Sequence, residues 1–225
     1  MREFGWLLLP VIAFAFLDWA STWKGWKKRL YVAKPAVVIL LILWTYLATG
    51  WHDGMLWFGI GLLFSLAGDV FLMLGPSFFM PGMAAFVFTQ ISYLIGFNQT
   101  PIEFTFPVAT AAVIVGLAAS GIFRIIRPGI EAKFKKRRML VPFFIYFAVL
   151  TLMTLSALLT LMRPDWTQPS AALAAVGGVL FLTSDSLLSY NRFVKSFPHA
   201  STWVHLTYHL GQLGIIIGAV LHFTG

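Results

Sequence analysis

Eight long apolar segments, separated by short connections, constrain the fold of this chain more than any other feature. A helix needs about 20 mainly apolar residues to cross a bilayer. The segments that satisfy this requirement cover residues 4–20, 35–51, 54–75, 82–98, 106–126, 139–162, 170–190 and 201–223. Because 59% of the 225 residues are hydrophobic and only 11% are charged, no stretch is left for a soluble domain. We predict an all-α membrane protein with eight transmembrane helices, in which residues 1–225 form a single polytopic membrane domain.

Lysine and arginine are concentrated on one side of the predicted helices. Of the 16 basic residues, 14 lie in or beside the connections that follow the first, third, fifth and seventh segments: Lys24, Lys27, Lys28, Arg29, Lys34, Arg124, Arg127, Lys133, Lys135, Lys136, Arg137, Arg138, Arg192 and Lys195. Only Arg2 and Arg163 fall on the other side. The positive-inside rule then predicts cytoplasmic basic loops and outside termini, as in a bacterial inner-membrane protein. Topology therefore accounts for the net charge of +8, and we expect a lipid bilayer rather than nucleic acid as the partner.

Two aspartates lie inside apolar segments in matching contexts. Asp69 is the only charge in GLLFSLAGDVFLML (residues 61–74), and Asp185 is the only charge in VLFLTSDSLLSY (residues 179–190). A carboxylate deep in a membrane helix costs about 2.5–3.5 kcal/mol on insertion scales, so it indicates a functional site. Both segments are predicted to run inward, and each aspartate lies five residues before the end of its stretch. We therefore place both carboxylates at the same depth of the inner leaflet.

The matching contexts also indicate a weak internal duplication. Gly68-Asp69 in the third segment corresponds to Ser184-Asp185 in the seventh, and strong basic connections follow the first and fifth segments. Because each half would contain four helices, the halves would be parallel and related by an axis along the membrane normal. The predicted repeat is 4+4, with halves 1–100 and 101–225. The alternative is chance similarity among apolar helices.

Further polar side chains lie near the aspartates. A stripe with the helical spacing i, i+3, i+4, i+7 consists of His205, Tyr208, His209 and Gln212. Gln90 and Tyr93 share one face of the fourth segment, and Asp18 and Lys34 lie near the cytoplasmic ends of the first and second. The tyrosines and amides have an alternative role in hydrogen bonds between helices, and Asp18 and Lys34 have one as interfacial anchors.

Acid–base catalysis is the chemistry that two such carboxylates favour. Two buried carboxylates that face each other cannot both ionise cheaply, so one is expected to act as an acid and the other as a base. The chain contains no cysteine and no G-x-S-x-G motif, which excludes thiolate catalysis and gives a serine nucleophile no support. We assign no cofactor or metal to the site. The alternative is a zinc ion bound by the two aspartates together with His205 and His209.

Several short motifs follow one another along most of the chain. They are Lys34-Pro35 at the opening of the predicted second helix, Gly68-Asp69 followed by VFLML, AFVFTQISYLIGF (residues 85–97), Ser184-Asp185-Ser186 continuing to Asn191-Arg192-Phe193, and Tyr208 with Gln212. In these residues and in their order, the sequence resembles the YhhN-type lysoplasmalogenase family of integral membrane proteins with eight predicted helices. It departs from the family at Gln90, where His is often found, and His209 is a candidate substitute for that His.

The resemblance implies hydrolysis of the vinyl-ether bond of a lysoplasmalogen, a lysophospholipid, to a fatty aldehyde and a glycerophospho-ethanolamine or -choline. This reaction starts with protonation of the carbon β to oxygen, and water then captures the oxocarbenium ion. Asp69 and Asp185 are expected to be catalytic, one as the acid and the other to stabilise the cation and activate water. Lys34 and Arg192 are expected to bind the phosphate group of the substrate. The full set of expected substrate contacts is Lys34, Gln90, Tyr93, Ser184, Asn191, Arg192, Tyr208, His209 and Gln212.

A function of another class remains open from the sequence. A proton-coupled transporter or lipid flippase would also place paired carboxylates between parallel repeats. Turnover in detergent separates the two classes, because a transporter performs no reaction there. The oligomeric state has no signal in the sequence.

Overall fold

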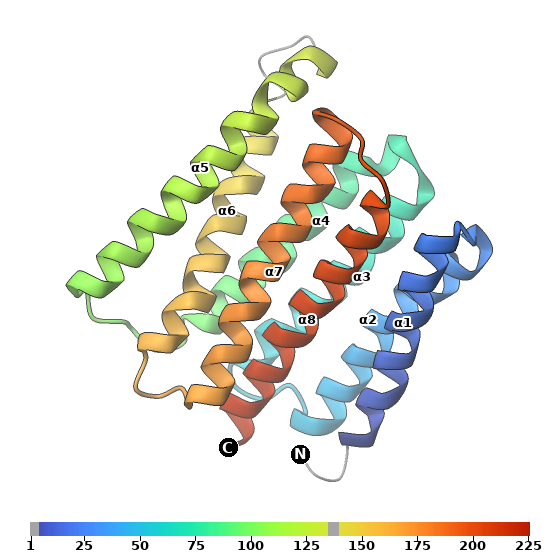
Figure 1. The fold of residues 1–225 in the computed structure, drawn as a ribbon. Coiled ribbons are helices and arrows are strands. Elements are labelled where there is room, and N and C mark those ends of the chain that lie inside the picture. Colours follow the sequence, from blue (N-terminus) through green and yellow to red (C-terminus); the bar gives the residue numbers. More distant parts are fainter. Residues whose placement is uncertain (1–4, 135–139) are drawn as a thin grey trace.

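Long helices form almost all of the part of the chain that the computed structural model describes, residues 5–134 and 140–225 (Figure 1). They are α1 (Leu8–Lys24), α2 (Lys27–Thr49), α3 (Met55–Leu74), α4 (Phe79–Phe97), α5 (Phe106–Phe134), α6 (Leu140–Leu159), α7 (Gln168–Phe193) and α8 (Ala200–Thr224). Short 3₁₀ turns precede α1 and α4 and follow α6: η1 (Gly5–Leu7), η2 (Pro76–Phe78) and η4 (Thr160–Met162). All eight helices are long and apolar enough to cross a membrane. The predicted all-α membrane fold is confirmed, and the chain is an integral membrane protein.

Consecutive helices run antiparallel and pack as a bundle in which α7 and α8 form the most extensive pair (Figure 1). α1 and α2 pack together at one side, where α1 also contacts α8. α5 lies at the opposite edge, contacts α6 and α7, and has the smallest buried share of the eight spans. The buried polar residues that the structure describes meet among α1, α2, α3, α4, α6, α7 and α8, that is, among all the helices except α5. The predicted 4+4 repeat stays a prediction.

Two helices extend well beyond the apolar segments that predicted them. α2 begins at Lys27 rather than at residue 35, so Pro35 lies inside the helix and does not open it. α5 likewise continues past residue 126 to Phe134, with Pro128 inside. Hydropathy marks only the part of a helix in hydrocarbon, whereas Lys and Arg are good helix formers and allow it to continue into the polar layer. Proline is tolerated inside membrane helices because neighbouring groups satisfy the freed carbonyl.

The basic end of the bundle is opposite the end where the chain terminates. The α1–α2 connection, which joins Lys24 to Lys27, and the α7–α8 connection, which carries Lys195, lie at the same end in Figure 1. The C-terminal end of α8 lies at the other. Five basic residues used in the topology prediction lie outside the described residues: Arg2, Lys135, Lys136, Arg137 and Arg138. The side of the membrane that each end faces stays a prediction.

Glycines bring the backbones of α7 and α8 into contact. A Cβ atom added to Gly177 would lie 2.4 Å from the backbone nitrogen of Ile215, and one added to Gly214 would lie 2.8 Å from the Cα of Gly177. One added to Gly211 would lie 2.9 Å from the nitrogen of Phe181. Such close approach is typical of helix pairs in membranes, where small residues allow backbones to touch. It fixes the register of α7 against α8 and so the positions of the polar side chains that both carry.

Candidate active site

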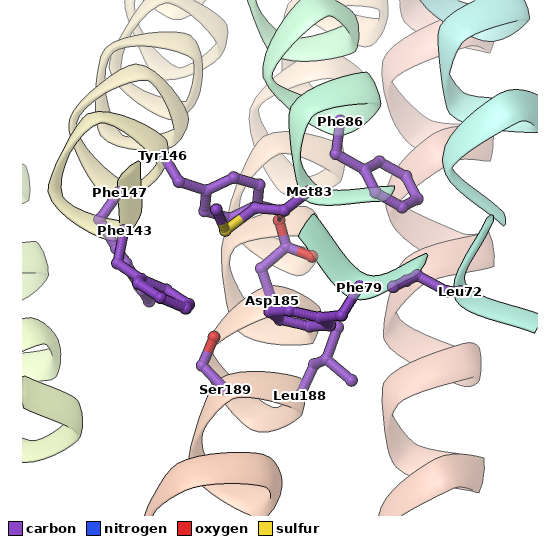
Figure 2. Close-up of a pocket in the computed structure, with 10 residues that line it drawn as sticks. All are labelled: Leu72, Phe79, Met83, Phe86, Phe143, Tyr146, Phe147, Asp185, Leu188 and Ser189. Atoms are coloured by element: carbon purple, nitrogen blue, oxygen red, sulfur yellow. Dashed lines mark hydrogen bonds between the residues drawn. The ribbon is translucent and has the colours of Figure 1, made fainter. Parts of the chain in front are cut away.

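Asp185 on α7 lines a small apolar cavity, called the inner cavity below (Figure 2). The walls come from α3, α4, α6 and α7 and consist of Leu72, Phe79, Met83, Phe86, Phe143, Tyr146, Phe147, Asp185, Leu188 and Ser189. Figure 2 shows the carboxylate of Asp185 pointing among the aromatic side chains of α4 and α6. Among these wall residues Asp185 is the only acid or base apart from the Tyr146 phenol. The cavity therefore offers one carboxyl group to an otherwise apolar ligand.

Two neutral donors hold the carboxylate of Asp185. The hydroxyl of Tyr146 on α6 donates to Oδ2 at 2.5 Å, and Nε2 of Gln90 on α4 donates to the same oxygen at 3.3 Å. The described residues give Asp185 no salt bridge. Both hydrogen bonds end at Oδ2, so Oδ1 is the oxygen left to interact with a ligand.

A second cavity, called the vestibule below, adjoins the inner cavity at the basic end of the bundle. Its walls consist of Lys27, Leu30, Tyr31, Lys34, Leu72, Met73, Phe79, Leu188, Arg192, Ser201, Val204 and His205. Leu72, Phe79 and Leu188 line both cavities. Three wall residues are cationic and none is acidic, so the vestibule suits an anion. The guanidinium of Arg192 lies 3.8 Å from the ring centre of Phe79, which keeps it at the boundary between the two cavities.

Asp69 on α3 has a different environment from Asp185. Its Oδ1 lies 2.9 Å from Nζ of Lys34, and its Oδ2 accepts a hydrogen bond of 2.8 Å from the hydroxyl of Tyr208. The side chain is only 1% exposed and is absent from the walls of both cavities. Lys34 does line the vestibule, so the ion pair connects a buried carboxylate to a cavity wall.

A chain of hydrogen bonds continues from Asp69 into the bundle. We call it the polar ladder, and its members are Lys34, Asp69, Tyr208, Ser65, Gln212 and Tyr93. Tyr208 and Ser65 are 2.6 Å apart, Nε2 of Gln212 donates to Ser65 at 2.6 Å, and the hydroxyl of Tyr93 donates to Oε1 of Gln212 at 2.7 Å. The ring of Tyr93 lies against Gly61, eight residues before Asp69, so the ladder extends roughly 12 Å along α3. Tyr93, Tyr208 and Gln212 thus bind one another, and none lines either cavity.

The two aspartates have no hydrogen-bond partner in common within the described part of the chain. Phe86 belongs to both neighbourhoods. Its ring lines the inner cavity with Asp185 and packs edge-on against Tyr208, at 5.9 Å between ring centres. Gly68 makes room for this ring, because a Cβ atom there would lie 2.7 Å from it. In the Gly68-Asp69 pair, the glycine therefore allows Phe86 to pack closely and the aspartate forms the ion pair with Lys34.

The two histidines of α8 lie beside Asp18 of α1. Nδ1 of His205 is 2.7 Å from Oδ2 of Asp18, and Nδ1 of His209 is 3.7 Å from the same oxygen. Within residues 5–134 and 140–225, no group of three or more His, Cys, Asp or Glu side chains is arranged to hold a metal ion. The zinc site that would have joined both histidines to Asp69 and Asp185 is therefore not formed by these residues.

Comparison with known proteins identifies the family. The model of the YhhN family matches residues 30–219 of this chain. The chain belongs to the YhhN family. The resemblance predicted from the motifs is therefore confirmed. The matched span of the YhhN family includes the polar ladder, the inner cavity with Asp185, and every wall residue of the vestibule except Lys27.

Curated relatives of this YhhN protein carry a common name. The human protein named lysoplasmalogenase TMEM86B is 25% identical over 196 residues, which cover 87% of this chain and 76% of the relative. The mouse protein of the same name is 28% identical over 206 residues, or 91% of this chain and 81% of the relative. The human protein named lysoplasmalogenase TMEM86A is 28% identical over 165 residues, or 72% and 64%. No solved structure matches the chain.

The remaining predicted site residues of this YhhN protein lie at the edge of the site. The hydroxyl of Ser184 donates to the carbonyl of Val204 at 2.9 Å and so ties α7 to α8. Asn191 is half-buried on α7 and is not among the wall residues of the two cavities.

Sequence reasoning missed three features of the site. Ser65 could have been found, because it lies one turn before Asp69 on the same helix face. Tyr146 was visible only as a tyrosine in the middle of an apolar segment. The pairing of Asp18 with His205 joins the first helix to the last and has no local signal.

Proposed function

We propose that this protein hydrolyses the vinyl-ether bond of lysoplasmalogens, giving a fatty aldehyde and a glycerophospho-ethanolamine or -choline. The observation that carries the proposal is a single carboxyl group, Asp185, in an apolar cavity that adjoins a basic vestibule. The groups of a lysoplasmalogen follow in the matching order: the alkenyl chain suits the apolar cavity, the vinyl ether comes next, and the phosphodiester suits the basic vestibule. The curated relatives named lysoplasmalogenase support the same activity.

The vestibule is the proposed site for the phosphate. Lys34 and Arg192 both line it, and charge-assisted hydrogen bonds from an ammonium and a guanidinium are the strong ones for phosphate oxygens. The start of the alkenyl chain then lies in the inner cavity, whose aromatic and aliphatic walls replace water. The vinyl ether lies between phosphate and chain, at the boundary formed by Leu72, Phe79 and Leu188.

Asp185 is the proposed acid. The rate-limiting step of vinyl-ether hydrolysis transfers a proton to the carbon β to oxygen, and a carboxyl group among apolar side chains favours its uncharged form. We assign the proton to Oδ1, because Tyr146 and Gln90 both donate to Oδ2. Once the proton is transferred, the carboxylate faces the oxocarbenium ion and stabilises its charge, as a carboxylate does in glycoside hydrolysis.

We propose that Asp69 positions the ammonium of Lys34 and does not itself transfer a proton. Its charge is balanced by the ammonium at 2.9 Å, and its side chain reaches neither cavity. A buried ion pair of this kind fixes the direction of the cation, and Tyr208 fixes the carboxylate in turn. The ammonium of Lys34 is then preorganised at the vestibule wall for the phosphate.

The proposal is tested by substrate specificity in detergent. Purified protein is incubated with a lysoplasmalogen and with the lysolipids that carry a saturated ether or an acyl ester at the same position. We expect aldehyde from the vinyl ether alone, at a rate that a chelator does not change. Absence of turnover by folded protein, together with lipid movement across liposomes, would instead support the transporter. Loss of turnover on chelation would point to a metal enzyme.

We also propose that the vestibule faces the cytoplasm of a bacterial inner membrane. The basic residues at that end of the bundle support this orientation. Because the chain has no cysteine, single-cysteine variants give an unambiguous test. A membrane-impermeant thiol reagent added to whole cells should label Asp53→Cys, between α2 and α3, and should leave Lys195→Cys, between α7 and α8, unlabelled. The reverse pattern would invert the proposed topology.

A further inference from the structure

A carboxylate–histidine pair at the wall of the vestibule takes no part in the chemistry proposed above. Asp18 on α1 is fully buried, and its Oδ2 lies 2.7 Å from Nδ1 of His205 on α8. His205 is one of the vestibule wall residues, whereas Asp18 is not. The pair therefore consists of a buried carboxylate and an imidazole that lines the vestibule.

The contact with Asp18 decides which ring nitrogen of His205 is available to a ligand. A carboxylate accepts a hydrogen bond, so Nδ1 carries the hydrogen, and Nε2 is left to accept or return a proton. This is the arrangement in which a buried carboxylate orients a histidine for proton transfer. His209, the neighbouring histidine, is fully buried at 3.7 Å from Asp18 and is absent from the vestibule wall.

The packing of α7 against α8 brings this pair close to Asp185. The hydrogen bond from Ser184 to the carbonyl of Val204 joins the residue before Asp185 to the residue before His205. Leu188, one turn after Asp185, lines the vestibule with His205 as well as the inner cavity. A substrate that spans both cavities therefore has the carboxyl group on its chain side and the imidazole on its phosphate side.

We propose that His205, oriented by Asp18, is the base that deprotonates the attacking water and the acid that protonates the departing glycerol oxygen. This assignment rests on the proposed function. The inner cavity is apolar, so water reaches the oxocarbenium carbon from the polar vestibule, where His205 lies. The glycerol oxygen is on the same side, because it connects the reacting carbon to the phosphate-bearing backbone.

The protons and bonds balance over three steps. First, the O–H bond of Asp185 breaks and a C–H bond forms at the carbon β to oxygen, which leaves the oxocarbenium ion. Second, water forms a C–O bond to that ion and gives a proton to Nε2 of His205, which yields a hemiacetal. Third, the hemiacetal hydroxyl returns a proton to the Asp185 carboxylate, the bond to the glycerol oxygen breaks, and His205 protonates that oxygen. The net reaction consumes one water, and both side chains return to their starting states.

The test uses four variants, His205→Ala, His205→Gln, Asp18→Asn and His199→Gln, together with free imidazole. His205→Ala removes the proposed base and leaves a space beside the vestibule, and His205→Gln retains an amide donor for Asp18 but cannot transfer protons. His199→Gln is the matched control, because this exposed histidine precedes α8 and stacks on Trp23 outside the vestibule. Thermal unfolding and gel filtration establish that each variant is folded.

We expect His205→Ala and His205→Gln to lower kcat by about 10²–10⁴-fold, the range for general acid–base catalysis, with a much smaller change in KM. Added imidazole should restore much of the kcat of His205→Ala and none of that of His205→Gln. Asp18→Asn, a change at the positioning residue, should lower kcat less than His205→Ala and should not respond to imidazole. His199→Gln should behave as the parent.

The outcomes separate this assignment from the proposed function. If the parent releases aldehyde and folded His205→Ala keeps the parent's kcat but has a raised KM, the histidine binds the head group and the assignment is overturned. A fall in kcat that imidazole leaves unchanged, in a folded variant, shows a structural role and also overturns it. If the parent releases no aldehyde, the proposed function and this assignment fall together.

Discussion

Asp69 and Asp185 share burial, helix direction and a small residue before them, yet their surroundings differ in kind. Asp69 pairs with the ammonium of Lys34, begins a ladder of neutral hydrogen bonds and reaches no cavity. Asp185 receives hydrogen bonds from two neutral side chains, pairs with no cation among the described residues and lines a cavity. The contrast teaches that two buried carboxylates can have quite different partners. What distinguishes the two is whether a positive charge already compensates the group and whether a ligand can touch it.

The largest effect is expected from replacing the carboxyl group that lines the cavity. Asp185→Asn keeps the shape and an acceptor for Tyr146 but removes the transferable proton, so kcat should fall by about 10²–10⁴-fold. Stability should change little, by about 1 kcal/mol or less, because no charged partner is left behind. Rates of aldehyde release and thermal unfolding in the same detergent measure both quantities. Activity within a few-fold of the parent would remove Asp185 from the mechanism.

The next effect concerns stability at the other aspartate. Asp69→Asn leaves the ammonium of Lys34 buried without its carboxylate, and breaking a buried ion pair in this way costs about 3–5 kcal/mol. We expect a large fall in the free energy of unfolding, measured by denaturant or heat in detergent. The control is the double variant Lys34→Met with Asp69→Asn, which removes both charges and should recover most of the loss. If the single variant is as stable as the parent, the ion pair does not hold the structure.

A smaller effect should separate binding from chemistry at the vestibule. Arg192 lines this cavity, and no carboxylate pairs with it among the residues that the structure describes. Hydrogen bonds to charged groups contribute about 1.5–3 kcal/mol, so Arg192→Gln should raise KM about tenfold or more and change kcat less. Steady-state kinetics with a lysoplasmalogen measures the split. A fall in kcat at constant KM would show that Arg192 acts in the chemical step, as proposed for Asp185, and not in phosphate binding, as proposed for Lys34.

The smallest effect is expected at the far end of the polar ladder. Tyr93→Phe removes the donor to Oε1 of Gln212 and leaves that buried oxygen without its partner, at a cost of about 1–3 kcal/mol. The free energy of unfolding should therefore fall by less than in Asp69→Asn. Thermal unfolding of both variants side by side checks the order. The opposite order would mean that the ladder, rather than the ion pair, is the main contributor to stability.

The sequence predicted the elements well and their contacts poorly. Apolar length was enough to locate eight helices, and α3 (Met55–Leu74) differs from the predicted 54–75 by one residue at each end. The start of α2 was wrong by eight residues, because a basic segment can be helical without being apolar. The depth of the two aspartates in the membrane, obtained from a rise of 1.5 Å per residue, stays a prediction.

The partners of each polar side chain depend on helix rotation, which the sequence does not encode locally. Most of these helices are apolar on every face, because lipid is as apolar as the protein interior. Among the described helices, only α8 has a polar stripe long enough to mark its inward side, with His205, Tyr208, His209 and Gln212 all buried. The two aspartates were therefore predicted to face one another, whereas the structure gives each its own partners. Tyr146 and Gln90 meet Asp185 from two other helices, and only a three-dimensional arrangement reveals that meeting.

The glycine contacts between α7 and α8 have a consequence for protein engineering. Gly177, Gly211 and Gly214 leave no space for even a methyl group, so the two helices that carry Asp185 and His205 form a fixed frame. A library meant to change which lipids the protein accepts should leave this frame untouched. It should vary the aromatic wall that α6 contributes, Phe143 and Phe147, because side chains there border the inner cavity and belong to neither helix of the frame.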